Sequence, residues 1–347
     1  MEREFFGFPD IQQFRNVIQD VTYRTRYIGK DENGEPLFDS TIPLPVLNYR
    51  GTVKLHGTNS GVIFVKDSEL DVYQFYCQSR ENIITPQKDN MGFAAFVHTR
   101  PVLELLNLIP EELIVDSPII KVYSEWCGQK IQSGVGIAKL SKRMVIFGIK
   151  INDEWVSDDI LKNVKLPDHN IFNILDYPVY NITIDFNNPK EAADKMGLLV
   201  DEIDKECPVA KAFGVEGPGE GCVFIPCDKE WLNGRFFFKV KGLTHKISET
   251  REKVPVNTEK VNSISEFVSN TVTENRLNQG LDKLRENNLE LEIKNIAFFL
   301  KWVYGDIVKE ELDTMMANGI EPKEVGGAIS NKARPWFMQK LNEKAGI

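Results

Sequence analysis

The chain has 347 residues, of which 42% are hydrophobic and 27% are charged, as in an ordinary soluble protein with one large domain and a smaller one. No run of about 18 apolar residues is present, and Met1–Glu4 does not begin a signal peptide. We therefore expect a cytoplasmic protein without a membrane span. The formal net charge is −9, so any contact with nucleic acid must come from a local basic patch.

Residues 1–242 are predicted to be mostly strands separated by turns, with helices near 93–108 and 191–206. The strands are predicted from their β-branched and aromatic content. They lie at 46–53, 74–80, 122–128, 144–149, 219–226 and 237–242. Several carry a charged residue, which is costly to bury unless it is paired or bound to a ligand. The charged strands are therefore the candidates for a binding site.

The composition changes after residue 242. Residues 248–262 are polar and contain Pro255, which predicts a linker. From residue 263 onward, apolar residues recur at three- and four-residue spacing, which predicts helices at 265–287, 289–316 and 322–344. One stripe is predicted to be core, and it consists of Ile296, Phe299, Leu300, Val303 and Ile307.

The predicted fold class is α+β, with three segments. Residues 1–247 form a domain built on mixed or antiparallel sheets, 248–262 a linker, and 263–347 a small all-helical domain. The five cysteines show no Cys-x-x-Cys spacing, and their odd number argues against a disulfide framework and against a zinc site.

The segment Val53–Asn59 is the most informative part of the sequence. Lys54 follows a predicted strand and precedes His56 and Gly57. A lysine amine can act as a nucleophile, and a glycine lets the backbone approach a ligand closely. Taken alone, the segment favours a solvated lysine before a turn, because lysines are common at strand ends.

Charged residues downstream change that balance. Because strand side chains alternate, Lys239 and Lys241 point the same way, and Glu220 is expected to share a face with Cys222 and Phe224. Together with Lys54, two acidic residues and this lysine pair would make a nucleotide site.

The chain resembles the covalent nucleotidyltransferases, which comprise DNA ligases, RNA ligases and mRNA capping enzymes. The motifs that carry the resemblance are Lys54-x-His56-Gly57, Arg80, Ser124-Glu125-x-x-Gly128, Phe147, Glu220-Gly221-x-Val223 and Lys239-x-Lys241. DNA ligases and capping enzymes usually carry Asp at the place of His56. The string Lys54–Asn59 is instead similar to the nick-sealing RNA ligase 2 family. Helices, rather than an OB-fold barrel, are predicted after Lys241, as in that family.

The resemblance implies an ATP-dependent RNA ligase that uses Mg²⁺ or Mn²⁺. Lys54 would attack the α-phosphorus of ATP and hold AMP as a phosphoramidate. AMP would pass to an RNA 5′-phosphate, which is then sealed to a 3′-hydroxyl. The expected partner is a nicked RNA duplex. The enzyme is expected to be a monomer that acts in the cytoplasm, or in the host cytoplasm if a virus encodes it.

The resemblance also assigns roles to individual residues. Glu125 would contact the ribose, Phe147 would stack on adenine, and Glu220 would hold the metal. The catalytic set would be Lys54, Glu220, Lys239 and Lys241. The reference pKa of lysine is ~10.4, and the two cations Lys239 and Lys241, burial and the metal are expected to lower that of Lys54. Glu216 competes with Glu220, although the strand 223–226 after Glu220 favours the latter.

Three further residues are assigned to phosphate and metal-bound water: Arg80, whose fork suits a phosphate and the RNA end, and His56 with Asn59. The sequence departs from the phage pattern in two places. Val53 stands where phage relatives carry Glu, and the Lys54–Arg80 interval is longer, which implies an inserted hairpin around 66–71.

The tail carries a second resemblance to phage RNA ligase 2, at Arg276, Asp306 and Glu310. These residues would engage the RNA end. The alternative is that Asp306 and Glu310, at i and i+4, form a solvated helix face. Rival functions for the whole chain are a DNA ligase, a capping guanylyltransferase or a non-catalytic RNA-binding relative.

Overall fold

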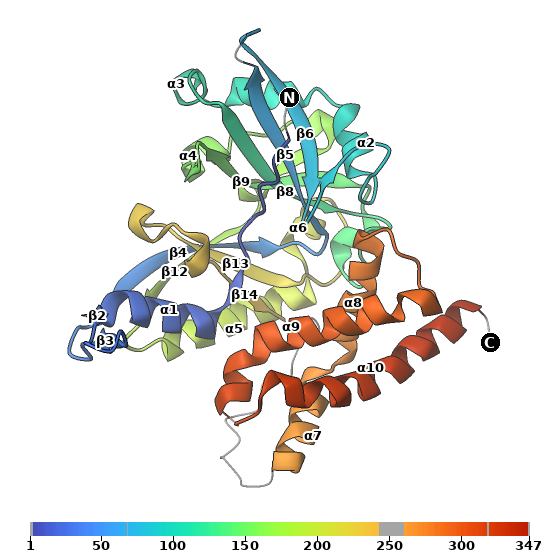
Figure 1. Cartoon of the computed structure of the whole chain (residues 1–347). Coiled ribbons are helices and arrows are strands. Elements are labelled where there is room, and N and C mark those ends of the chain that lie inside the picture. The colour runs from blue at the N-terminus through green and yellow to red at the C-terminus, as the bar shows by residue number, and fades with distance from the viewer. Residues whose placement is uncertain (1–2, 68, 243–259, 318, 346–347) are drawn as a thin grey trace. The chain divides into compact units, whose positions relative to one another are not determined.

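The computed structural model describes residues 3–67, 69–242, 260–317 and 319–345. Its contacts divide the chain into two compact units, Met1–Leu243 and Thr244–Ile347. The first unit is built on two large sheets with helices around them, and the described part of the second is helical (Figure 1). The α+β fold class predicted from the sequence is confirmed.

The first large sheet has five strands in the order β1-β14-β13-β4-β12. Their bounds are Gln12–Gln13 for β1, Val46–Lys54 for β4, Val179–Asp185 for β12, Gly221–Pro226 for β13 and Phe238–Lys241 for β14. β1 runs parallel to β14, and the other neighbours are antiparallel. Helices α1 (Phe14–Arg26) and α5 (Lys190–Lys205) contribute Val21 and Val200 to a core with Tyr49 and Val53 of β4. Since side chains alternate along a strand, Lys54 lies on the opposite face of this sheet.

The second large sheet has the order β10-β9-β8-β5-β6-β7, and β11 pairs with β9. The strands are β5 Thr58–Asp67, β6 Val72–Ser79, β7 Ile83–Ile84, β8 Ile119–Cys127, β9 Arg143–Ile151, β10 Glu154–Trp155 and β11 Ile171–Asn173. One face packs against α2 (Phe93–His98) and the 3-10 helix Val102–Leu108. The sequence suggested helix throughout 93–108, but the helix breaks before Pro101, which has no backbone N–H to donate.

Smaller elements complete the first unit. β2 (Tyr27–Lys30) and β3 (Pro36–Phe38) form a hairpin. Three short helices follow later in the chain: α3 Glu111–Ile114, α4 Asp158–Leu161 and α6 Pro208–Ala212.

The second unit contains α7 (Lys260–Thr271), α8 (Glu274–Glu286), α9 (Ile296–Ala317) and α10 (Pro322–Ala345). The predicted stripe on α9 is confirmed as core, with Phe299, Val303 and Ile307 fully buried. No helix among the described residues is long and apolar enough to cross a membrane. Apart from its last three residues, which belong to α7, the predicted linker at 248–262 lies outside the described residues.

One predicted helix, at 265–287, is two helices in the structure. Thr273 lies between α7 and α8, and its hydroxyl accepts a hydrogen bond from the backbone N–H of Arg276 (3.3 Å). A threonine at this position satisfies an N–H that has no partner within the helix. The break is therefore set by a cap that the apolar periodicity does not reveal.

Candidate active site

The register of three neighbouring strands brings distant charged residues together. Gly221, the first residue of β13, pairs with Lys54 of β4 on one side and with Lys241 of β14 on the other. Glu220 directly precedes β13. The ends of these antiparallel strands therefore place one carboxylate between two lysines.

Glu220 bridges the two lysines and a histidine. Its Oε2 lies 2.7 Å from Lys54 Nζ and 3.3 Å from His56 Nδ1, and its Oε1 lies 3.0 Å from Lys241 Nζ. The Glu220 side chain is only 2% exposed. A buried charge is tolerated only when it is paired in this way, so the four residues form one electrostatic unit.

Gly221 determines the direction in which Glu220 points. Cys222 and Phe224 lie in the core beside α5, whereas Glu220 reaches Lys54 on the opposite face. The prediction that Glu220 shares a face with Cys222 and Phe224 is therefore wrong. Gly221 has φ +147°, which interrupts the alternation, and a Cβ there would lie 2.1 Å from the Val240 carbonyl oxygen. Only glycine fits this position.

The pKa values of the central pair follow from their contact. Burial raises the pKa of Glu220, but the cations Lys54 and Lys241, with His56, hold it well below its usual range. Burial lowers the pKa of Lys54, but Glu220 and Glu125 raise it by more, so the net direction is up. The predicted lowering of the Lys54 pKa included a bound metal; the side chains alone raise this pKa, because the nearest charges are carboxylates.

Lys241 behaves in the opposite way. Burial lowers its pKa, and the neighbouring Lys54 and Lys239 lower it further, by more in total than Glu220 raises it. Lys239 lies on the same face of β14, two residues away, and supplies part of this positive potential. The expected lysine pair is thus present, but its effect falls on Lys241.

Glu125 lies on β8 beside this group. Its Oε1 accepts a hydrogen bond from the Gly57 backbone N–H (2.9 Å), and Asn59 is its cross-strand partner. A Cβ on Gly57 would lie 2.3 Å from the Trp126 carbonyl oxygen, so only glycine allows this close approach. Burial raises the pKa of Glu125 to about 7, with Glu220 adding to the shift and Lys54 opposing it.

This raised pKa predicts a pH-dependent effect of Glu125→Gln on stability. Because the folded-state pKa of Glu125 exceeds the unfolded one, ionisation destabilises the wild-type fold progressively from about pH 4.5 to pH 7. Glutamine keeps the acceptor for Gly57 and carries no charge. The variant should match the wild type near pH 4 and be more stable by about 1–3 kcal/mol above pH 7.

Thermal melts at pH 4, 6 and 8 test this expectation. The exposed Glu104 offers a matched control, because Glu104→Gln should show no such trend. A Glu125→Gln variant that is less stable than the wild type at pH 8 would show that the charge of Glu125 stabilises the site.

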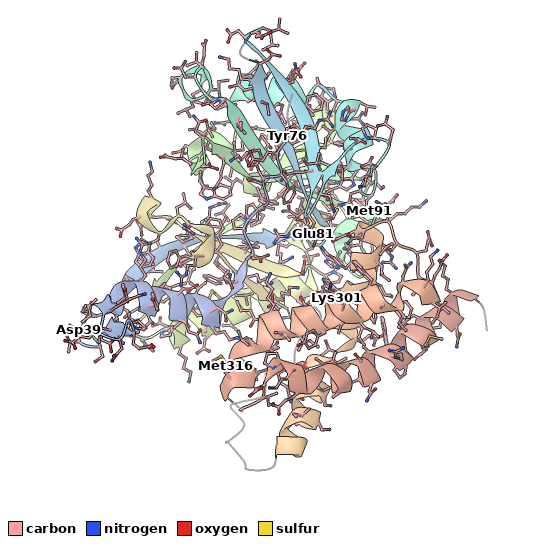
Figure 2. All side chains as sticks on the ribbon, viewed as in Figure 1. Asp39, Tyr76, Glu81, Met91, Lys301 and Met316 are labelled. Carbon is pink, nitrogen blue, oxygen red and sulfur yellow. The ribbon has the colours of Figure 1, made fainter. Side chains whose placement is uncertain are left out.

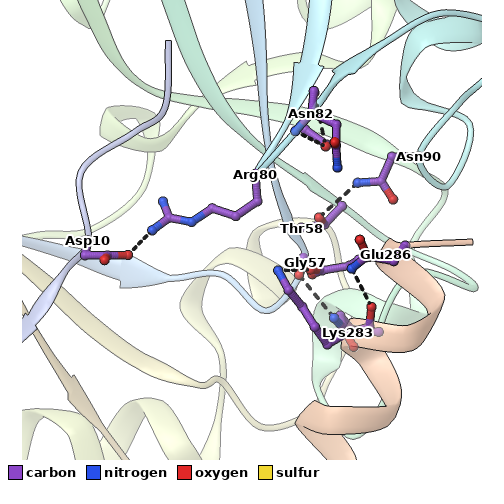
Figure 3. Close-up of polar contacts among 11 residues, drawn as sticks. Asp10, Gly57, Thr58, Arg80, Asn82, Asn90, Lys283 and Glu286 are labelled. Carbon is purple, nitrogen blue, oxygen red and sulfur yellow. Dashed lines mark hydrogen bonds and ion pairs between the residues drawn. The ribbon is translucent and has the colours of Figure 1, made fainter. Parts of the chain in front are cut away.

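Arg80 follows β6 and contacts the N-terminal segment. Its Nη1 donates to the Phe8 carbonyl oxygen (2.8 Å), and its Nη2 forms an ion pair with Asp10 (Figure 3). Phe8 also packs edge-on against Phe147 of β9, with ring centroids 4.9 Å apart. Phe8 and Asp10 were not predicted from the sequence, because their partners lie about 70 to 140 residues away.

Phe147 lines a cavity in the first unit. The cavity has a volume of about 400 Å³, within the usual range for small-molecule sites, and its lining includes Arg50, Trp155 and Ile225. Arg50 is buried and its Nε lies 2.8 Å from an Asp158 carboxylate oxygen. The lining of this cavity does not include Lys54, Glu125, Glu220 or Lys241.

Glu216, the alternative to Glu220, is exposed, and its backbone carbonyl accepts a hydrogen bond from Lys139 Nζ (2.8 Å). The geometry therefore favours Glu220 as the carboxylate next to Lys54.

The tail residues lie in the second unit and form a buried network. Arg276 is fully buried, and its Nε donates to Asp306 (2.9 Å), its Nη1 to the Thr271 carbonyl oxygen (2.7 Å) and its Nη2 to Glu311 (3.5 Å). With no exposed surface, Arg276 cannot bind RNA directly in this arrangement. The alternative of a solvated face formed by Asp306 and Glu310 also fails, because Asp306 is the partner of Arg276 and both acids are only partly exposed.

The donor set near Lys54 fits a magnesium ion that is bound mainly through a nucleotide. The described residues contain no cluster of three or more metal-ligating side chains. Mg²⁺ commonly takes only one or two carboxylates, with waters and phosphates as its other ligands. Glu220 and Glu125, which both act on Lys54, supply such a pair.

Comparison with known proteins defines the class of this fold and site. The sequence model of the RNA ligase family matches residues 48–241, more than half of the chain, and this segment contains Lys54, Glu125, Glu220 and Lys241. The chain therefore belongs to the RNA ligase family. Comparison with curated proteins gives no match.

Solved structures of an RNA ligase from Naegleria gruberi are similar to this chain. The form with AMP and Mn has a TM-score of 0.42 at 17% identity, and the form with ATP and Mn has 0.40 at 16%; each comparison covers 70% of this chain and 58% of the other. The form with pyrophosphate has 0.39 at 18%, covering 70% and 60%. The chain thus spans less than two thirds of the length of these ligases.

Proposed function

We propose that this chain is an ATP-dependent RNA ligase that works through a lysyl-AMP intermediate. The observation that carries the proposal is the contact of Lys54 with Glu220, and of Glu220 with Lys241, inside the segment matched by the family. Lys54 is the lysine at the turn that contains His56 and Gly57, so its side chain supplies the primary amine there.

In the first step, Lys54 Nζ attacks the α-phosphorus of ATP. The Lys54 ammonium first passes a proton to water, which leaves a neutral amine. As this amine attacks, a nitrogen–phosphorus bond forms, the bond from the α-phosphorus to the pyrophosphate oxygen breaks, and pyrophosphate leaves. The nitrogen then passes a second proton to water. Glu220 would hold a divalent cation, and the positive charge of that cation would weaken the hold of this carboxylate on the Lys54 ammonium. Lys241, with Lys239 beside it, faces the charge that develops on the phosphates.

The remaining residues bind and orient the nucleotide. Glu125 accepts hydrogen bonds from the ribose hydroxyls, and Phe147 stacks on the adenine. Arg80, His56 and Asn59 orient the phosphates. The AMP then passes to an RNA 5′-phosphate, and a 3′-hydroxyl displaces it to seal the strand.

The division of labour along the chain is part of the proposal. Residues 1–247 would carry adenylyl transfer, 248–262 would link the units, and the helices of 263–347 would help to engage the RNA end. Because Arg276 is buried, its part in this task would be to maintain the helical fold. A nicked duplex as substrate, a monomeric state and a cytoplasmic location remain predictions from the family resemblance.

The rival functions make different demands. A capping enzyme would take GTP in place of ATP, and a DNA ligase would join DNA strands equally well. A non-catalytic RNA-binding relative would tolerate a broken site, yet Lys54, Glu220 and Lys241 are in contact here. Labelling with ATP or GTP, followed by RNA and DNA nicks, separates these alternatives.

Glu220→Gln is the variant that tests the role of the central carboxylate. Glutamine keeps the shape of Glu220 and removes its charge, so it should slow adenylylation by about 10²-fold or more. Glu216→Gln is the matched control, since Glu216 is exposed, and it should label at the wild-type rate. Labelling rates with α-labelled ATP and Mg²⁺ decide between them, and the reverse pattern would move the metal role to Glu216.

A further inference from the structure

The N-terminal segment lies extended along the side chains of β6. Tyr76 lies in the body of β6 (Figure 2). Its hydroxyl donates to the Glu4 carbonyl oxygen (2.6 Å) and accepts from the Glu4 backbone N–H (3.3 Å). The Gln78 amide does the same for Phe6, donating to its carbonyl oxygen (2.5 Å) and accepting from its N–H (3.1 Å). Two alternate residues of β6 thus hold two alternate residues of the segment.

Arg80 continues this pattern by donating to the Phe8 carbonyl oxygen (2.8 Å). Each of the three pairs is separated by 72 residues, so the segment follows β6 in a fixed register. We call residues 4–10 the strap. Immediately after it, Gln12 joins the other large sheet, where its backbone N–H donates to the Phe237 carbonyl oxygen (2.9 Å).

The strap ends at the guanidinium of Arg80. Besides the bond to Phe8, Arg80 forms an ion pair with Asp10. A guanidinium has five N–H donors in a rigid fork, and the strap uses one from each terminal nitrogen. Three donors are left for a phosphate, so the strap can hold Arg80 without blocking it.

Phe8 anchors the strap through contacts with other aromatic rings. It is 6% exposed and packs against Tyr123, Phe147 and Trp155, with ring centroids 4.9–5.6 Å apart. This aromatic cluster belongs to the second large sheet and its β10 edge. The segment that carries Asp10 is therefore anchored on both sides of Arg80, and Asp10 is held in place by more than its own ion pair.

We propose that Asp10 is a positioning residue, which the strap places so that the fork of Arg80 is fixed before a nucleotide phosphate arrives. A long side chain loses rotamer freedom when it binds, and a fork that is already held loses less. The proposal rests on the proposed function, because it takes Arg80 as a phosphate contact. It adds a residue outside the segment that the family model matches.

Asp10→Ala and Asp10→Asn test this role through the ATP concentration that half-saturates adenylylation of Lys54. Alanine removes the acceptor, so this concentration should rise about fivefold. Asparagine keeps an oxygen acceptor at the same place and should remain within about twofold of the wild type. In an Arg80→Ala background, Asp10→Ala should not change the half-saturating ATP concentration further, because Arg80, the partner of Asp10, is already absent in this double-mutant cycle.

A control variant removes a comparable ion pair elsewhere in the first unit. Asp20 pairs with Arg235 at 2.6 Å, and Asp20→Ala should leave the half-saturating ATP concentration unchanged. Three results would overturn the proposal: no change in Asp10→Ala, an equal effect in the Arg80→Ala background, or tighter ATP binding in both Asp10 variants. The last result would mean that Asp10 restrains Arg80 from binding phosphate.

A second measurement does not depend on activity. The Arg80 Nε–H signal of ¹⁵N-labelled protein without ATP should report an ordered side chain in the wild type and in Asp10→Asn, and a mobile one in Asp10→Ala. If the wild type fails to adenylylate while Asp10→Ala mobilises Arg80, the proposed function fails and the strap contact stands. If Arg80 is equally ordered in all three proteins, the positioning role of Asp10 is wrong.

Discussion

Lys54→Arg and Lys54→Ala are expected to carry no AMP after incubation with α-labelled ATP and Mg²⁺. Arginine keeps the positive charge beside Glu220, so the buried carboxylate remains paired and the fold should survive. A guanidinium cannot become the neutral nucleophile that attack on phosphorus requires, because it keeps its proton at every pH at which the protein is folded. AMP labelling should therefore be lost completely in both variants. In Lys54→Arg, this loss cannot be ascribed to unfolding.

Lys66→Arg is the matched control for the first prediction. Lys66 lies on β5, the next strand along the chain, where its Nζ donates to the Val115 carbonyl oxygen (2.5 Å) and pairs with Asp71 (2.7 Å). This variant should label like the wild type. Label that persists at wild-type yield in Lys54→Arg would show that another residue carries AMP.

Arg276→Ala is expected to unfold the helical unit. The change leaves Asp306 and Glu311 without their buried cation, and breaking a buried pair in this way costs about 3–5 kcal/mol. The Thr271 carbonyl at the end of α7 also loses its donor. Hydrogen exchange of the α8 and α9 amides should therefore lose its protection, while the strands of the first unit stay protected.

Arg285 offers the control on the same helix. It is exposed and pairs with Asp282 at 2.6 Å, an i,i+3 contact worth less than about 1 kcal/mol, so Arg285→Ala should leave exchange unchanged. If Arg276→Ala keeps full protection and still loses RNA joining, Arg276 has a direct role with RNA and its burial in the free protein is transient.

Local patterns predicted most of the elements. The strands that carry Lys54, Glu125 and Lys241 were expected within one to three residues of their observed ends, because β-branched and aromatic runs there are bounded by turn residues. The core stripe of α9 follows from its spacing. The helix boundaries at Pro101 and Thr273 were missed, because apolar periodicity does not report a cap or a break.

The site could be predicted as a set of residues but not as a geometry. Motif order identified Lys54 and Glu220, yet the direction of the Lys54 pKa depends on which charge is nearest, and this follows only from strand register. Likewise, the face of Glu220 depends on the backbone at Gly221, where strand alternation fails.

Contacts between segments far apart in the chain could not be predicted from the sequence. The strap contacts residues of β6 and Arg80 that lie 72 positions later in the chain, and no pattern in residues 4–10 predicts Arg80 as a partner. The same holds for Arg276, which was assigned to RNA by resemblance but whose partners Asp306 and Glu311 enclose it in the helical core. A charged residue in a helix is predicted to be exposed from the sequence alone, because its partners in the fold are not known.

The fate of AMP bound to the full-length protein is the most direct test of RNA ligase activity. Wild-type chain labelled with α-labelled ATP, freed of nucleotide and mixed with a nicked RNA duplex carrying a 5′-phosphate, should lose its label in a single turnover. The label should pass to the RNA 5′ end and then appear as free AMP, in step with a sealed strand. Label that stays on the protein, or leaves it without a sealed RNA strand, would contradict the assignment as an RNA ligase.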